Sequence, residues 1–377
     1  MGTAPRSLEV VVVGGGVIGM SIAWRAARAG FSVAVVDDPT RAAASNVAAG
    51  MLAPVTEAEY GEERLLQLNL ESSRRYEGFV EELMSVTGHD VGYVRCGTLT
   101  VARDLDDNTA LEDVYRFQQS LGLTVERLRG SACRTLEPLL APRTRGGILV
   151  EGDHQVDPTA LVAALTDACK RDGVALHESG AASLTTGPRP EVVLRTGERL
   201  ACTTVVVAAG TWSGSIDGMP PAALPPVRPV KGQLVHLRTR DGDPFTERNI
   251  RGLDVYVVSR PDGRVIVGAT VEEQGFDATV TAGATYELLR NAYELLPGIT
   301  ELAFVASVAG LRPGTPDNAP IIGRVEEGVL VATGHYRNGI LLAPVTADAI
   351  VDLLMSDRVP DSVAPFGPER FATVAAR

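Results

Sequence analysis

The chain has 377 residues, of which 45% are hydrophobic and 22% are charged, and its formal net charge is −12. This balance excludes wholesale disorder, and the length exceeds one ordinary hydrophobic core, so we predict two domains. The negative charge argues against nucleic acid and an anionic membrane as partners. No apolar run reaches membrane-spanning length and the first predicted strand begins within ten residues, so we expect no signal peptide and a cytoplasmic location.

A glycine-rich turn near the N-terminus joins a predicted strand to a predicted helix. Residues 8–13 are a β-branched run suited to a strand buried on both faces, and G-x-G-x-x-G follows at 14–19. A helix over 20–29, a second strand over 31–36 and two aspartates at 37–38 complete the unit. A glycine-rich turn without a ligand is the alternative, but this context favours dinucleotide binding.

Each glycine of the turn has a physical role in that interpretation. Gly14 allows the tight turn, Gly16 lets the backbone approach a pyrophosphate, and Gly19 lets helix and strand pack closely. Asp37 would accept hydrogen bonds from an adenosine ribose, and its charge argues against a 2′-phosphate.

Residues 39–60 favour FAD over NAD as the dinucleotide. A nicotinamide dehydrogenase would continue through further alternating strands and helices, whereas this segment is irregular and rich in Ala, Ser and Gly. Small residues allow chain and cofactor to touch closely. A flexible linker is the alternative, but Met51, Leu52 and Pro54 make the segment too apolar for one.

The middle of the chain mixes helical and strand patterns. Residues 61–87 carry helical periodicity, and Asp157 followed by Pro158 predicts a helix start. A proline-rich stretch at 219–229 predicts a boundary, after which the strands alternate as in an antiparallel sheet. The predicted strands are 174–177, 192–194, 203–210, 232–237, 253–259 and 264–269.

Residues 328–344 predict a strand end, a polar turn bracketed by Gly334 and Gly339, and an apolar helix. Free N–H groups at a helix start, with the helix dipole, favour negative charge above them. A flavin that has accepted a hydride carries such charge at its N1/C2=O edge. Taken alone, the pattern also fits a strand–loop–helix connection that binds no ligand, with a histidine hydrogen-bonded inside the protein.

The chain is therefore predicted to leave a nucleotide-binding domain, build a sheet, and return near residue 306. The predicted fold class is α/β (α+β overall), with a Rossmann-like FAD-binding domain and a discontinuous second domain on a mainly antiparallel sheet. The FAD-binding domain is assigned to 1–85, 148–218 and 306–377. The substrate-binding domain is assigned to 86–147 and 219–305.

Four segments in order resemble the FAD-dependent D-amino-acid oxidase superfamily, and within it the glycine oxidases of thiamine biosynthesis. They are residues 14–19, 48–52, 309–315 and 334–341. The resemblance implies oxidation of glycine by O2 and water to glyoxylate, ammonia and hydrogen peroxide through an imine that supplies the thiazole of thiamine. It also implies sarcosine and small D-amino acids as lesser substrates, and a homo-oligomer, specifically a tetramer.

The resemblance also assigns substrate-binding residues. Arg312 takes the substrate carboxylate, for which the planar guanidinium is suited, and Tyr256 reaches the same carboxylate from the sheet. Arg337 and Gly50 lie near the substrate. The alternatives to substrate binding are that Arg312 forms a surface ion pair and that Tyr256 is a core aromatic residue. Asp254, on the same predicted strand face as Tyr256, departs from the family pattern and leaves the substrate identity open.

No residue stands out as a general base, because FAD accepts the hydride when the amine arrives neutral. Sarcosine oxidases of this superfamily attach FAD through a cysteine near the motif that Arg312 occupies here. The cysteine nearest in sequence is Cys202, so the resemblance implies non-covalent FAD. The four cysteines are expected to be buried free thiols rather than a disulfide or metal site, and no metal is predicted. The predicted FAD contacts are Gly14, Gly16, Val17, Ile18, Gly19, Asp37, Asp38, Ala44, Ser45, Ala49, Gly50, Met51, Ala182, Gly210, His335, Tyr336, Arg337, Asn338, Gly339, Ile340 and Leu341.

Three other functions are considered for the same fold. One is a D-amino-acid oxidase or dehydrogenase of other specificity. Another is a dehydrogenase that passes electrons to a membrane quinone, against which the lack of a basic amphipathic or apolar anchor argues. The last is a flavin-binding module without amine chemistry, for instance in RNA modification, against which the acidic balance and the pair of Arg312 and Tyr256 argue.

Overall fold

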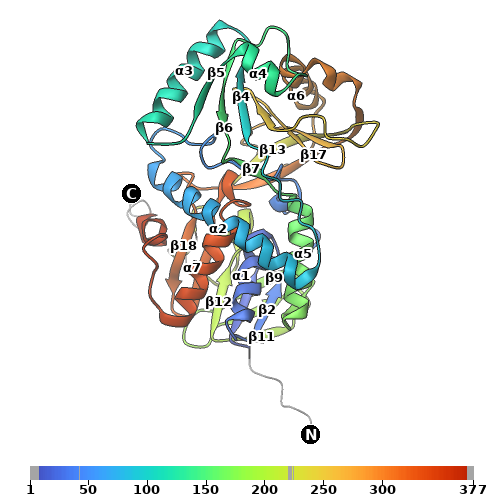
Figure 1. The fold of residues 1–377 in the computed structure, drawn as a ribbon. Coiled ribbons are helices and arrows are strands. Elements are labelled where there is room, and N and C mark those ends of the chain that lie inside the picture. Colours follow the sequence, from blue (N-terminus) through green and yellow to red (C-terminus); the bar gives the residue numbers. More distant parts are fainter. Residues whose placement is uncertain (1–7, 42, 220–222, 224, 372–377) are drawn as a thin grey trace.

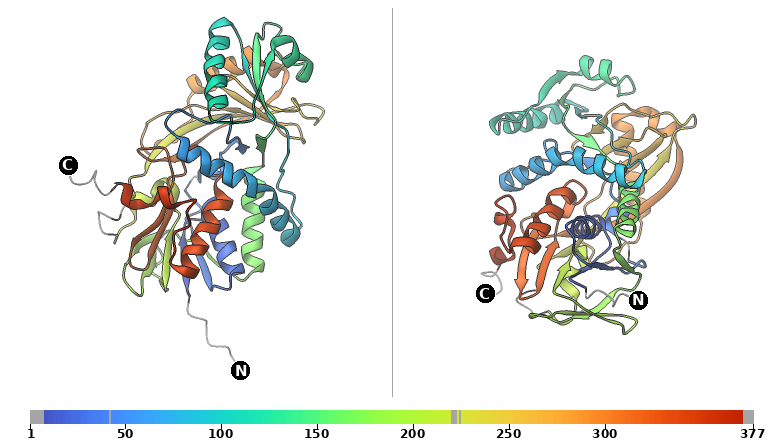
Figure 2. Two further views of the ribbon diagram at one scale, coloured as in Figure 1. Left: turned by 60° about the vertical axis from the view of Figure 1, so that its left-hand side comes forward. Right: turned by 60° about the horizontal axis from the view of Figure 1, so that its bottom comes forward.

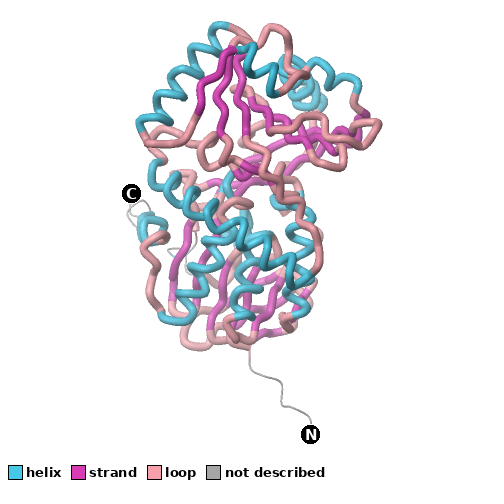
Figure 3. The backbone as a smooth tube through the Cα atoms, in the orientation of Figure 1, coloured by secondary structure: helices cyan, strands magenta, loops and turns pink. Residues whose placement is uncertain are grey.

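The computed structural model describes residues 8–41, 43–219, 223 and 225–371. The chain folds into two stacked lobes, each with its own sheet (Figure 1). In the lower lobe of Figure 3 helices flank the strands, whereas strands fill the middle of the upper lobe. The helices are α1 (Val17–Arg28), α2 (Glu63–Thr87), α3 (Leu105–Ser120), α4 (Gly130–Leu136), α5 (Pro158–Arg171), α6 (Ala282–Leu295) and α7 (Ala343–Ser356).

The lower lobe is built on a six-stranded, mostly parallel sheet. Its core strand β1 consists of four buried valines, which suits a strand covered on both faces. It pairs in parallel with β2 and β12, and β12 pairs in parallel with β19. In spatial order the strands are β18 (Ile321–Glu326), β19 (Val329–Thr333), β12 (Thr204–Val207), β1 (Val10–Val13), β2 (Val33–Val36) and β8 (Ala175–His177).

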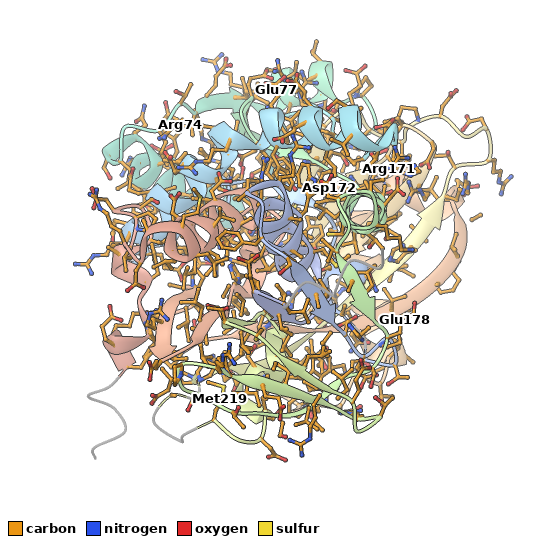
Figure 4. All side chains as sticks on the ribbon, turned by 90° about the horizontal axis from the view of Figure 1, so that it is seen from below. Arg74, Glu77, Arg171, Asp172, Glu178 and Met219 are labelled. Atoms are coloured by element: carbon orange, nitrogen blue, oxygen red, sulfur yellow. The ribbon has the colours of Figure 1, made fainter. Side chains whose placement is uncertain are left out.

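Helices α1, α5 and α7 pack together over one face of this sheet, and α2 crosses them below the upper lobe (Figure 2). Trp24 of α1 meets Phe79 of α2 edge to face, with ring centroids 5.6 Å apart. On the outer side of α2, Arg74 and Glu77 point away from the packed interior (Figure 4). The buried stripe of α2 confirms the helical periodicity predicted for residues 61–87.

The upper lobe is built on an eight-stranded, mainly antiparallel sheet, flanked by α3, α4 and α6. One exception to the antiparallel pairing is β14 with β4, which are parallel. In spatial order the strands are β17 (Ala303–Gly314), β13 (Arg228–Arg238), β16 (Arg264–Gly268), β15 (Tyr256–Ser259), β14 (Asn249–Arg251), β4 (Thr98–Ala102), β6 (Gly146–Val150) and β5 (Glu126–Arg129). Two smaller sheets hold β9 (Ala181–Leu184), β10 (Glu191–Leu194) and β11 (Arg199–Ala201), and β3 (Met51–Leu52) with β7 (His154–Gln155).

The structure moves two of the expected domain boundaries. Residue 148 falls inside β6 and residue 306 inside β17, and both strands belong to the upper sheet. The pairing of β17 with β13 runs from Gly314 opposite Arg228 to Ala303 opposite Arg238. The chain therefore returns to the lower lobe after residues 150 and 314. Backbone pairing between segments far apart in sequence sets these boundaries, and local patterns do not reveal it.

Several element ends also differ from expectation. Helix α1 begins at Val17 rather than residue 20, directly after the N-cap Gly16. Strand β15 begins at Tyr256 rather than 253, because the Gly252 N–H bonds the Val255 carbonyl in a turn. Strand β13 begins at Arg228, inside the proline-rich stretch 219–229, of which residues 220–222 and 224 lie outside the described part.

Two further observations concern the chain as a whole. Cys96, Cys133, Cys169 and Cys202 are buried and free, as predicted. Across the described ranges, the structure contains no helix that is both long and apolar enough to cross a lipid bilayer.

Candidate active site

A cavity of about 810 Å³ lies where the two lobes meet. It is lined by the β1–α1 turn, the irregular segment after β2, the ends of β12 and β19, and residues of β13, β15 and β17. Because the carboxyl ends of parallel strands gather at one edge of a sheet, the predicted nucleotide-binding segments meet there.

The glycine-rich turn shapes one end of the cavity. Gly14 has φ +116°, and a Cβ on it would overlap the Ala208 carbonyl oxygen, so only glycine fits. A Cβ on Gly19 would overlap the Gly14 carbonyl oxygen. Because glycine has no side chain, α1 can pack closely against the end of β1. The Gly15 N–H donates to Asp37 Oδ1 at 2.9 Å, and this bond holds the Asp37 carboxylate at the mouth of the turn.

A buried arginine that the sequence analysis did not identify holds the segment after β2. The side chain of Arg260 is 2% exposed and donates to the Ala49 carbonyl and to Gln155 Oε1, both at 2.6 Å. Burial lowers the pKa of Arg260 to about 10, so it stays protonated at neutral pH. Gly50 has φ +81°. Together these features fix the backbone at 49–50 against the cavity.

The C-terminal turn closes the cavity from the lower lobe. His335 is 2% exposed, and its Nε2 lies 3.0 Å from Thr346 Oγ1. Burial lowers the pKa of His335 to about 3, so the imidazole is neutral and serves structure rather than acid–base chemistry. The predicted helix after Gly339 begins only at Ala343, because a 3-10 turn at Tyr336–Asn338 and the bond from the Leu342 N–H to the Asn338 carbonyl come first.

Arg312 and Tyr256 line the upper side of the same cavity, as predicted. Arg312 Nη1 donates to the Thr270 carbonyl at 3.0 Å. A Cβ on Gly232 would overlap the guanidinium, so this glycine makes room for it. Burial raises the pKa of Tyr256 to about 12, so its hydroxyl remains a hydrogen-bond donor at neutral pH.

The other lining arginines all have carboxylate partners. Arg41 pairs with Asp38 at 3.4 Å, and Arg251 pairs with Glu57 at 2.9 Å. In contrast, no carboxylate among the described residues lies within ion-pair distance of Arg312. Its guanidinium is therefore the one that a substrate carboxylate can pair with at least cost.

Arg337 lines the cavity as predicted but is already engaged. Its guanidinium contacts Glu62 at 2.5 Å, Glu59 at 3.2 Å and Glu57 at 4.0 Å. These carboxylates, which precede or begin the predicted helix 61–87, were not identified from the sequence. Arg337 therefore lies at the cavity with three carboxylates already around its guanidinium, whereas Arg312 has none.

Asp254 also lines the cavity, and its carboxylate bonds Arg103 at 3.1 Å. It lies in the turn before β15, and its side chain is 62% exposed. Tyr256 and Val258 pack in one cluster, so the predicted strand alternation holds for those two residues.

Most predicted FAD contacts line the cavity, but four do not. Ala182 is exposed on β9, where its neighbours Gly180 and Ala181 line the cavity instead. Gly19 and Leu341 are packed into the lower lobe, and Asn338 is buried behind the turn that carries it. Lining residues that the sequence analysis missed include Trp212, Leu234 and Thr270; the only signal for Trp212 was its place after Gly210.

Asp153 anchors the backbone that leads to Glu57. Its buried carboxylate accepts from the Val55 N–H at 3.2 Å and the Thr56 N–H at 2.7 Å. Burial raises its pKa from 3.8 to about 7. The folded state thus binds a proton that the unfolded state has lost between these pH values, so the free energy of unfolding falls as the pH rises from about 4 to about 7.

Between pH 5 and pH 8, the free energy of unfolding of the wild type is expected to fall by on the order of 2 kcal/mol more than that of Asp153→Asn. Urea unfolding of both proteins at the two pH values measures this difference. Equal pH dependence of the unfolding free energy in the two proteins would contradict the raised pKa of Asp153.

Comparisons with known proteins agree with this geometry. Residues 9–353 match the family model described as FAD dependent oxidoreductase. The chain is 34% identical to the glycine oxidase of Geobacillus kaustophilus, over 96% of this chain and 97% of that protein. The crystal structure of a glycine oxidase from that organism matches with a TM-score of 0.87, at 32% identity over 95% of this chain and 97% of that one.

Two further relatives carry different names. The bifunctional protein ThiO/ThiG of Synechocystis sp. is 35% identical over 97% of this chain, which spans 54% of that longer protein. The crystal structure of iminodiacetate oxidase from Chelativorans sp. BNC1 matches with a TM-score of 0.87, at 26% identity over 96% of this chain and 99% of that one.

Proposed function

Because the chain belongs to the family of FAD-dependent oxidoreductases, we propose that it oxidises glycine and related small amines such as sarcosine and small D-amino acids. For glycine, O2 and water are consumed, and glyoxylate, ammonia and hydrogen peroxide are formed through the imine. The similarity to the ThiO/ThiG protein supports the further proposal that this imine is used to build the thiazole of thiamine. The observation that carries the proposal is Arg312, a lining guanidinium without a carboxylate partner among the described residues.

The residues at the lower end of the cavity fit FAD. The glycine cradle at Gly14 and Gly16 would hold the pyrophosphate, and the Asp37 carboxylate would hold the ribose. The backbone at 49–50, fixed by Arg260, and the turn at 335–340 would hold the flavin. Bound FAD supplies the hydride acceptor. None of the four buried cysteines lines the cavity, which supports non-covalent binding.

The chain's own contribution is orientation and electrostatics. The Arg312 fork and the Tyr256 hydroxyl would hold the substrate carboxylate, and this fixes the α-carbon over the flavin-binding end of the cavity. The neutral His335 is turned toward Thr346, so it is not positioned to accept the amine proton. We propose that the substrate amine is already neutral when it reaches the flavin-binding end of the cavity.

Anaerobic addition of glycine to the yellow protein is expected to bleach the flavin absorbance. Readmission of air should restore the colour and yield hydrogen peroxide, measured by a coupled peroxidase assay. Bleaching without reoxidation by air would identify a dehydrogenase that uses another acceptor. A spectrum that glycine, sarcosine and D-alanine all leave unchanged would exclude the proposed substrate class.

A second candidate substrate follows from the name of one structural neighbour, iminodiacetate oxidase. Iminodiacetate is glycine with a carboxymethyl group on its nitrogen, so its second carboxylate would need a second cation, whereas Arg312 is the only lining arginine without a carboxylate partner among the described residues. We also propose, from the family resemblance, a cytoplasmic homo-oligomer, specifically a tetramer.

A further inference from the structure

Three glutamates surround Arg337 at the substrate end of the cavity. We call Glu57, Glu59 and Glu62 the glutamate cage. Glu62 makes the closest contact, at 2.5 Å, and its other oxygen accepts from Asn318 Nδ2 at 2.9 Å. The side chains of Glu62 and Arg337 are 13% and 18% exposed, so this pair is shielded from solvent.

The cage belongs to the same region as the predicted substrate clamp. Glu57, Glu59 and Arg337 line the cavity together with Arg312 and Tyr256. Arg251 lies opposite Tyr256 in the pairing of β14 with β15, and it holds Glu57 at 2.9 Å, so both charges lie near Tyr256. A ligand held by Arg312 and Tyr256 would therefore lie close enough to the glutamate cage to interact with its negative charges.

The charges in this region do not cancel. Apart from Arg312, whose charge a substrate carboxylate would neutralise, Glu57, Glu59 and Glu62 carry three negative charges and Arg251 and Arg337 carry two positive ones, which leaves one negative charge in excess. Although burial lowers the pKa of Arg337, the three carboxylates raise it above its ordinary value, so Arg337 remains charged and paired. A second carboxylate on a substrate would bring a fourth negative charge to a guanidinium that three glutamates already contact.

We propose that the glutamate cage is a specificity determinant that restricts the substrate to amino acids with a single carboxylate. Arg312 takes that carboxylate, and the three negative charges around Arg337 disfavour a second carboxylate there. The ligand-binding part of this inference requires only the bound flavin as a reporter, whereas its catalytic part rests on the proposed oxidase function.

The first test uses acetate and malonate, which have one and two carboxylates and are not amines. Binding is measured as a perturbation of the flavin absorbance, so no turnover is needed. We expect wild type to bind malonate about tenfold more weakly than acetate. The double variant of Glu59→Gln and Glu62→Gln frees Arg337, so we expect the ratio to shift about tenfold toward malonate while acetate affinity changes less than about threefold.

Two further variants separate specificity from folding. Glu71→Gln removes a glutamate paired with Arg74 and Arg75 on the same helix, away from the cavity, and should leave the ratio unchanged. Glu59→Gln alone alters a residue that is 58% exposed, so it tests the inference if the double variant folds poorly. A purely structural cage would change both affinities and the thermal stability without shifting the ratio, and that result would overturn the inference.

The catalytic test compares kcat/KM for glycine and iminodiacetate. We expect wild type to prefer glycine, and the double variant to gain relative activity with iminodiacetate. Wild type that uses both equally well would overturn the inference while the proposed oxidase function stands. Wild type that oxidises neither, yet still binds acetate better than malonate, would refute the proposed function and leave the binding selectivity intact.

Discussion

Replacing Arg312 with alanine is expected to lower kcat/KM for glycine by roughly 30- to 1000-fold. A charge-assisted pair between a guanidinium and a carboxylate in a partly desolvated cavity contributes on the order of 2–4 kcal/mol. Arg312 Nη1 donates to the Thr270 carbonyl, and no carboxylate among the described residues pairs with the guanidinium, so its fork can take a substrate carboxylate. The flavin spectrum should stay near normal, because Arg312 projects from the upper sheet and the nucleotide-binding segments belong to the lower lobe.

Graded variants define the geometry of this clamp. Arg312→Lys should recover only part of the activity, because a point charge cannot reproduce the planar fork. Tyr256→Phe removes one hydroxyl donor and should reduce the transition-state stabilisation for glycine oxidation by about 1 kcal/mol. Ethylamine lacks a carboxylate, so it should be a poor substrate of wild type and nearly indifferent to the Arg312 change. Peroxide assays that find glycine oxidation by Arg312→Ala within about threefold of wild type would exclude the clamp.

Gly16→Val is expected to give folded but largely colourless protein. Gly16 lines the cavity, and the nearest neighbour of a Cβ there is Ser45 Oγ, at 3.4 Å. The backbone therefore tolerates a side chain, but the valine occupies the space through which a pyrophosphate approaches the turn. The ratio of flavin absorbance to protein absorbance measures occupancy, and far-ultraviolet circular dichroism checks the fold.

Gly78→Ala provides a matched control for that experiment. Gly78 lies on α2 with nothing within 4 Å of its added Cβ, so the variant should stay yellow and fold at least as stably as wild type. If Gly16→Val keeps full FAD occupancy, the glycine-rich turn does not bind the pyrophosphate, and the cofactor assignment at that end of the cavity fails.

Local sequence determines the parts of the site that were predicted well. The strand, turn and helix around Gly14 and Gly16 depend on contacts within about thirty residues, so the pattern was sufficient. Arg312 and Tyr256 were placed through family resemblance, and their cavity position agrees with it. Their roles in binding substrate stay predictions until the variants are measured.

The features that were missed depend on contacts between distant parts of the chain. Glu62 and Arg337 are 275 residues apart in sequence, and Arg260 and Ala49 are 211 residues apart. No periodicity or spacing rule links such pairs, and the position of one partner gives no information about the other. The domain boundaries moved for the same reason, since β17 is assigned by its pairing with β13.

The order of strands in the lower sheet has a consequence for synthesis of the protein on the ribosome. Strand β1 emerges first, but its neighbour β12 follows about two hundred residues later, and β19 follows more than three hundred later. Strand β2 can cover one edge of β1 early, but the other edge stays unpaired until β12 emerges, a condition that favours chaperone binding. Since the turn at 335–340 follows β19, the lining of the cavity is complete only after that turn has left the exit tunnel.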